Sequence, residues 1–313
     1  MVKIIFFGTP EIAVPFLKEC LEKHTVVGVI TQPDKPSSRH YKIHSPEVKI
    51  EAVKNEVDVF QPEKFNDELI EEIKALKPDV GIVVSYGKLI PKRVFDLPAF
   101  GCFNIHFSLL PKYRGAAPVQ WVLINGEKTT GVTSFWIEET LDSGPILVQK
   151  TVQIESDDEA TSLFNKLIPV GIEVMNETLD LLKNGKVPGT PQKGMPSLAP
   201  SLEKEDGKIN WAKSANEILN LIRGTYPWPG AYTLGSDGKM ANKRLKIIKA
   251  RLIPSPVKEK NGVVVELKKN EGFLVGCGEG ALLITEVQPE NKNPMSAWAF
   301  IQGGYVGLGS KFS

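Results

Sequence analysis

Residues 103–111 place an amide, an imidazole and a hydroxyl on one short apolar segment, and a carboxylate follows at Asp142. Side chains alternate along a β-strand, so Asn104 and His106, two positions apart, would point to the same face. There both groups could reach a single reacting atom with a hydrogen bond. Polar side chains at the end of a buried strand are costly unless they are paired or used for chemistry. We therefore interpret Asn104, His106 and Asp142 as a candidate catalytic set.

Each of these residues alone also has a structural interpretation. A single histidine on an apolar strand is more often a hydrogen-bonded core residue, and Asp142 precedes Ser-Gly as a turn residue often does. Their combination favours catalysis. A nucleophilic Ser108 activated by His106 is disfavoured, because the two lie only two positions apart and the chain has no nucleophile-elbow motif.

The bulk properties indicate a globular protein of two domains. The chain has 313 residues, 42% of them apolar and 24% charged, and its longest apolar runs are too short to span a membrane. No signal peptide is predicted at the N-terminus. The three cysteines are isolated and lack Cys-x-x-Cys spacing, which favours a reducing compartment and argues against zinc. We expect a cytoplasmic monomer with no metal and no membrane association.

Alternating strand and helix patterns over the first 182 residues predict an α/β domain with a Rossmann-like, mostly parallel sheet. After the first strand, Thr9 is expected to cap a helix that has Pro10 at its first position. Gly8 is the only glycine of a Gly-x-Gly-x-x-Gly motif there, so a nicotinamide oxidoreductase is disfavoured. The ranges expected to be strands are 2–7, 25–31, 79–86 and 102–107, and later helices are expected at 118–125 and 160–182.

The pattern then changes, which predicts a catalytic domain at 1–188, a linker at 189–206 and a C-terminal domain at 207–313. Five short strand patterns separated by turns favour a small β-barrel of the oligonucleotide-binding (OB) type in this last domain. Residues 208–313 hold 15 Lys/Arg against 8 Asp/Glu, whereas the rest of the chain is acidic. Such a balance favours contact with a polyanion, although a solvated strand face is an open alternative.

Several short motifs are spread along nearly the whole chain. They are Phe7-Gly8-Thr9-Pro10-Glu11, Thr31-Gln32-Pro33-Asp34, Ser85-Tyr86-Gly87, Asn104 to Pro111, Tyr113 to Gln120, Leu141-Asp142-Ser143-Gly144, Pro227 to Ala231 and Val287-Gln288-Pro289-Glu290. Together they closely resemble the methionyl-tRNA formyltransferases, which belong to the 10-formyltetrahydrofolate transferase and hydrolase superfamily. The motifs of the first domain mark the superfamily, and the Gly-Ala-Ala-Pro run and the later motifs favour the initiator-tRNA enzymes.

The resemblance implies transfer of a formyl group from 10-formyltetrahydrofolate to the α-amino group of methionyl-initiator tRNA. Asn104, His106 and Asp142 are then the catalytic set. The amine attacks the formyl carbon, and Asn104 and His106 can donate hydrogen bonds to the formyl oxygen as it gains negative charge. Asp142 would orient His106, and either of them could relay the amine proton to the leaving nitrogen. No metal and no covalent enzyme intermediate is needed.

By the same resemblance, two segments form the folate pocket, although plain core packing is an alternative for Leu109 and Leu110. One is the segment after the His106 strand, and the other is a loop over the pterin ring. Their residues are Ser108, Leu109, Leu110 and Pro111, and Ser85, Tyr86, Gly87, Leu89 and Ile90.

Two basic regions are the candidate tRNA contacts. In the family, the loop at 35–44 enters the acceptor-stem region, and here Arg39 and Lys42 keep its basic character. Ser38, His40 and Tyr41 replace residues expected there, which weakens a detailed transfer of contacts. The densest basic run, 239–251, holds six cations and no acid, and it supplies three further candidates: Lys243, Arg244 and Lys246.

Three other functions share part of this evidence. A formyltransferase acting on an amino sugar nucleotide or a 10-formyltetrahydrofolate hydrolase would use the same catalytic residues, but neither needs a basic barrel. A non-catalytic RNA-binding protein with a decayed transferase domain would not need a complete polar set.

Overall fold

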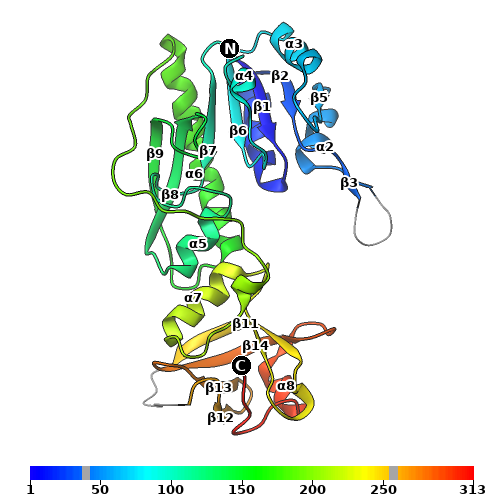
Figure 1. Cartoon of the computed structure of the whole chain (residues 1–313), viewed down its shortest axis with the longest axis vertical. Helices are drawn as coiled ribbons and strands as arrows, with labels where there is room; N and C mark the ends of the chain where they lie inside the picture. Colours follow the sequence, from blue (N-terminus) through cyan, green and yellow to red (C-terminus); the bar gives the residue numbers. More distant parts are fainter. Residues whose placement is uncertain (37–42, 254–259) are drawn as a thin grey trace. The chain divides into compact units, whose positions relative to one another are not determined.

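A computed structural model of the chain describes residues 1–36, 43–253 and 260–313 (Figure 1). Among these residues, no helix combines the length and the apolar character that a membrane span requires. The chain forms two compact units. The first consists of Met1–Pro118, Thr129–Gln153 and Phe164–Pro200, and the second of Val119–Lys128, Ile154–Leu163 and Ser201–Ser313. The linear boundaries at 188 and 206 stay a prediction.

The centre of the first unit is a mostly parallel sheet, which confirms the predicted fold class. Seven strands in the described part of the chain follow the order β5-β2-β1-β6-β7-β8-β9 (Figure 1). The strands from β5 to β7 are parallel to one another. β8 pairs antiparallel with β7, and β9 pairs antiparallel with β8. Their bounds are β1 (Lys3–Gly8), β2 (Thr25–Ile30), β5 (Val59–Phe60), β6 (Val80–Val84), β7 (Cys102–His106), β8 (Thr129–Trp136) and β9 (Ile146–Gln153). A short hairpin pairs β3 (Lys35–Pro36) with β4 (Ile43–His44).

Helices cover both faces of this sheet, which is why β1 and β6 are apolar along almost their whole length. On one face, aromatic rings of α1 and α6 pack around Phe107, just beyond β7. On the other, α3 and α4 join a core cluster with Phe7 and Cys102. Alternation along β7 puts Asn104 and His106 on the Cys102 face. The helices are α1 (Val14–Lys23), α2 (Glu47–Lys54), α3 (Asp67–Ala75), α4 (Lys92–Phe95) and α6 (Ala160–Leu181).

The predicted capping role of Thr9 is wrong. A 3₁₀ turn at Glu11–Ala13 precedes α1, and no side chain caps it. The Thr9 hydroxyl instead donates to the backbone carbonyl of Tyr86, 2.8 Å away. A distant loop offers an acceptor that the local sequence could not reveal, so tertiary structure overrides the local capping preference.

The order of strands creates a switch point between β1 and β6. From β1 the chain builds outward to β2 and β5 on one side, and β6 and β7 lie on the other. The loops that leave the carboxyl ends of β1 and β6 therefore separate and leave a crevice between them. Ligands of open α/β sheets bind in this position.

The second unit contains an antiparallel sheet in the order β10-β11-β14-β13-β12, with β15 paired to β14. The five strands predicted in the C-terminal domain are present as β10 to β14. The bounds are β10 (Tyr232–Leu234), β11 (Arg244–Ile253), β12 (Val264–Lys268), β13 (Gly272–Gly276), β14 (Ala281–Pro289), β15 (Met295–Ser296), α5 (Pro118–Ile124), α7 (Ala215–Thr225) and α8 (Ala297–Gln302).

The last residues of the chain close this sheet. Ser313 exchanges two backbone hydrogen bonds with Leu234 at the end of β10, of 3.0 and 2.9 Å. Ser310 accepts from the backbone N–H of Val264 at the start of β12, 2.9 Å away. One segment thus bonds to both edge strands, which leaves neither edge open there.

Candidate active site

A cavity of about 950 Å³ opens at the carboxyl ends of the parallel strands of the first unit. Pro10 follows β1, Ser85 follows β6, and Asn104 and His106 end β7. The remaining walls are largely apolar, with Phe135 among them, and two acids, Glu138 and Glu139, also line the space. The location agrees with the crevice that the strand order creates.

Asn104 and His106 both line this cavity. β7 pairs with β6 on one side and β8 on the other, so its backbone is fixed and both side chains have defined directions. Within the described part of the chain, no hydrogen-bond partner contacts the Asn104 amide. That amide can therefore donate to a ligand.

The His106 ring is oriented by two contacts. Its Nε2 lies 2.8 Å from the Tyr113 carbonyl oxygen, and its Nδ1 lies 3.7 Å from Oδ2 of Asp142. A carbonyl can only accept, so Nε2 carries a hydrogen and donates it. The other nitrogen, Nδ1, is then the one that can exchange a proton. The ring is 5% exposed, so these two contacts lie in a largely buried setting.

Asp142 lies in a turn between β8 and β9 and has a left-handed backbone with φ of 47°. Its Oδ2 accepts the backbone N–H of Gly115 at 2.8 Å, closer than it lies to His106. Gly115 has φ of 124°, and a Cβ atom there would lie 2.6 Å from the Ala199 carbonyl oxygen. This position therefore requires glycine, because the neighbouring backbone leaves no room for a side chain.

The loop after β6 lines the opposite wall, and all five residues predicted there, Ser85 to Gly87, Leu89 and Ile90, line the cavity. The Tyr86 carbonyl accepts from Thr9 Oγ1 at 2.8 Å and from Gln32 Nε2 at 3.0 Å. Three sequence motifs thus meet at one backbone carbonyl. Burial raises the pKa of the Tyr86 phenol to about 12.

The other four predicted folate residues do not line the cavity. The Ser108 hydroxyl is buried and donates to the Lys112 carbonyl at 2.7 Å. The Ser108 carbonyl accepts from Thr133 Oγ1, which in turn accepts the N–H of Leu110. The segment from Ser108 to Pro111, which comprises Ser108, Leu109, Leu110 and Pro111, therefore precedes the turn that leads to Tyr113. Its hydrogen bonds stabilise that turn.

The candidate tRNA residues divide into two groups. Arg39 and Lys42 lie outside the described residues. Lys243 and Arg244 are exposed, Lys246 is half-buried, and none of the three side chains forms an ion pair with a described residue, although the Arg244 backbone N–H donates to Glu290 at 3.4 Å. The Arg244 guanidinium lies 4.2 Å from the centre of the Tyr232 ring.

Further along β11, the remaining two cations differ from these three. Lys249 and Arg251 are neutralised by Glu286 and Glu271, at 3.5 and 2.8 Å. Uncompensated positive charge is therefore concentrated at the start of the strand, where a polyanion would be attracted most strongly.

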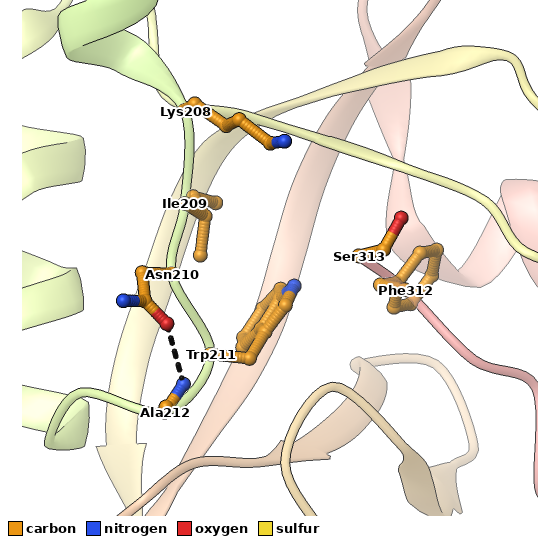
Figure 2. A pocket seen from close by; sticks show the side chains of 7 residues that line it. All are labelled: Lys208, Ile209, Asn210, Trp211, Ala212, Phe312 and Ser313. Atoms are coloured by element: carbon orange, nitrogen blue, oxygen red, sulfur yellow. Dashed lines mark hydrogen bonds between the residues drawn. The ribbon is translucent and has the colours of Figure 1, made fainter.

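A second hollow of about 460 Å³ lies in the second unit (Figure 2). Trp211 and Phe312 stack beside it with ring centres 6.2 Å apart, and Asn210 accepts the N–H of Ala212. Among the described residues, Lys208 is the only basic side chain that lines it, and no imidazole, thiol or carboxylate side chain does. We assign no chemistry to this hollow.

The sequence predicted many of the side chains that line the first cavity but not the backbone groups that hold His106 and Asp142. The Tyr113 carbonyl and the Gly115 N–H orient His106 and Asp142. Both lie in the motif from Tyr113 to Gln120, so the motif was noticed while its role was not. No group of three or more potential metal ligands occurs in the described ranges.

Residues 2–179 match the formyl transferase family, and residues 201–304 match the formyl transferase C-terminal domain. The chain belongs to the formyl transferase family.

Two relatives show which members it is similar to. It is 49% identical to the methionyl-tRNA formyltransferase of Endomicrobium trichonymphae, over 99% of this chain and 100% of that protein. It is 47% identical to the methionyl-tRNA formyltransferase of Thermodesulfovibrio yellowstonii, over 98% and 97% of the two chains.

Solved structures share the fold at lower identity. HypX from Aquifex aeolicus in complex with tetrahydrofolic acid has a TM-score of 0.63 and 19% identity, over 98% of this chain and 48% of HypX. An N-formyltransferase from Helicobacter canadensis, in complex with folinic acid and dTDP-3-aminofucose, has a TM-score of 0.66 and 23% identity, over 92% of this chain and 100% of that protein.

Proposed function

We propose that this enzyme transfers the formyl group of 10-formyltetrahydrofolate to the α-amino group of methionyl-initiator tRNA. Eight relatives called methionyl-tRNA formyltransferase, 40–49% identical, match at least 96% of this chain. The observation that carries the proposed chemistry is the meeting of Asn104, His106 and Asp142 at one cavity. The work would be done by a single chain, because all three belong to the first unit. The proposed location is the cytoplasm.

The proposed reaction begins when the methionine amine attacks the formyl carbon and a new C–N bond forms. Negative charge develops on the formyl oxygen, and Asn104 donates a hydrogen bond to it, a contribution of roughly 3 kcal/mol in comparable sites. His106 Nδ1 accepts the proton that the amine loses, and Asp142 stabilises the resulting imidazolium. The bond to N10 of the folate then breaks, and the proton passes from His106 to that nitrogen. Atoms and charge balance without a metal or a covalent enzyme intermediate.

The two substrates would occupy different parts of the surface. The loop from Ser85 to Ile90 lines the cavity, and we propose that its backbone binds the edge of the pterin ring. We propose that Ser108 to Pro111 support this pocket from below. Lys243, Arg244 and Lys246, together with Arg39 and Lys42, are the proposed contacts to tRNA phosphates.

The test is one assay with three acceptors. Purified protein is mixed with labelled 10-formyltetrahydrofolate and with charged initiator tRNA, charged elongator tRNA or a free amino sugar nucleotide. We expect label on the methionyl group of initiator tRNA. Label on the sugar nucleotide alone, or release of free formate with no acceptor labelled, would replace this proposal with a sugar formyltransferase or a hydrolase.

A further inference from the structure

The segment 190–199, which we call the strap, runs beside both loops that orient His106. At one end, Thr190 and Ile146 exchange two backbone hydrogen bonds of 2.7 and 2.8 Å. At the other, the Arg114 N–H donates to the Ser197 carbonyl at 2.8 Å, and the Ala199 N–H donates to the Arg114 carbonyl at 2.7 Å. The strap is therefore attached to the first unit by backbone bonds at each end.

Between these attachments, Gln192 makes three hydrogen bonds with its side-chain amide. Nε2 donates to the Asp142 carbonyl at 2.8 Å and to the Gly144 carbonyl at 2.9 Å. Oε1 accepts from Nη2 of Arg114 at 2.6 Å. The two amide hydrogens of Gln192 each bond to one carbonyl of the turn that carries Asp142. The amide oxygen is held by Arg114, which lies on the loop with Tyr113 and Gly115.

The turn also has local bonds, in which the Ser143 N–H and Oγ donate to the Thr140 carbonyl at 3.4 and 3.0 Å, but these do not reach the Asp142 and Gly144 carbonyls that Gln192 binds. Asp142 has a left-handed backbone, which costs free energy unless surrounding contacts hold it. The same residue must keep Oδ2 at 2.8 Å from the Gly115 N–H and 3.7 Å from His106 Nδ1. A shift of the turn by about 1 Å would break the first contact and alter the second, and misplacements of that size cost about 100-fold in rate.

We infer that Gln192 is a positioning residue. By bonding to the Asp142 and Gly144 carbonyls, it holds the turn so that the Asp142 carboxylate stays aligned with His106. Gln192 does not line the cavity, so it acts through Asp142 and not on the substrate. The strap does not depend on it, because backbone bonds attach both ends. The inference rests on the proposed formyl transfer for its kinetic readout, but a second readout is independent of that activity.

The kinetic test compares Gln192→Leu, which fills the same space without donors, with Lys193→Ala, an exposed neighbour on the strap. We expect kcat of Gln192→Leu to fall at least tenfold, with KM for the formyl donor within about twofold of wild type. Lys193→Ala should keep wild-type values. A Gln192→Leu enzyme with wild-type kcat would overturn the inference.

The structural test is amide hydrogen exchange by NMR, which needs no turnover. The Gly115 N–H bonds to Asp142, whereas the Ala117 N–H bonds to Ala199 on the strap at 3.0 Å. In Gln192→Leu we expect Gly115 to exchange at least tenfold faster while Ala117 is unchanged. Unchanged Gly115, or equal acceleration at both amides, would overturn the inference, since the second result means that the whole strap loosens.

Two safeguards keep the outcomes distinct. If wild-type protein fails to formylate methionyl-tRNA, the proposed function fails, yet the Gly115 measurement still decides the role of Gln192. If Gln192→Leu does not fold, Gln192→Glu keeps the shape and the Arg114 contact and removes both donors, and the same two outcomes apply to it.

Discussion

Replacing Asp142 with asparagine removes one negative charge and little else. The asparagine oxygen can still accept the Gly115 N–H, so the turn should keep its shape. The lost charge lies 3.7 Å from His106 Nδ1. At an effective dielectric constant of about 20, two unit charges at that separation attract by about 4 kcal/mol. Each 1.36 kcal/mol is a factor of ten in rate, so we expect Asp142→Asn to slow formyl transfer about 1,000-fold.

The assay is single-turnover transfer of labelled formyl to methionyl-tRNA, with the exposed Asp157→Asn as the matched control. A double-mutant cycle then asks whether the charge acts through His106. In a His106→Ala background, Asp142→Asn should cost less than about threefold further. A rate within tenfold of wild type, or an equal loss in both backgrounds, would refute the pairing of these two residues.

Three further predictions concern the folate loop, the basic strand and the thiols. A Cβ atom at Gly87, where φ is 79°, would lie 2.5 Å from Gln32 Nε2, so Gly87→Ala should raise KM for the formyl donor about tenfold with a smaller change in kcat. Joint reversal to glutamate of Lys243 and Arg244 should weaken tRNA binding and flatten its salt dependence by one to two units, as measured by titration at several salt concentrations, whereas Lys269→Glu should do neither. Burial raises the pKa of all three thiols, that of Cys277 to about 12, so at pH 8 they stay protonated and should react with a thiol reagent only after unfolding. The thiols are Cys20, Cys102 and Cys277.

The sequence predicts the sheet well, and it also predicts that Asn104 and His106 share a face, because both depend on short-range patterns. Apolar runs of strand length are visible in any window, and the two-residue spacing of Asn104 and His106 specifies a shared face wherever the strand lies. Asp142 was a candidate for its residue type, but it lies 36 positions after His106, and only the resemblance implied that it would orient the imidazole.

Contacts that join distant loops were not predictable in the same way. Thr9 has the residue type and position of a helix cap, yet its hydroxyl bonds to Tyr86, 77 positions away. Ser108 has the type of a ligand-binding residue, yet it bonds to the carbonyl of Lys112. In both cases the side chain satisfies whichever buried backbone group lies nearest in the folded chain, and residue type alone does not say which group that is.

The candidate site is ordered without a bound substrate, because a backbone group binds one polar atom of each of two proposed catalytic residues, His106 and Asp142. His106 has Nε2 bonded to the Tyr113 carbonyl, and Asp142 has Oδ2 bonded to the Gly115 N–H. These two backbone groups lie two residues apart on one loop, so a single loop sets the orientation of both side chains. Catalysis by fixed dipoles requires this kind of order, since reorientation during the reaction would add to the barrier. A substitution that shifts this loop without touching either side chain should therefore lower kcat more than it raises KM.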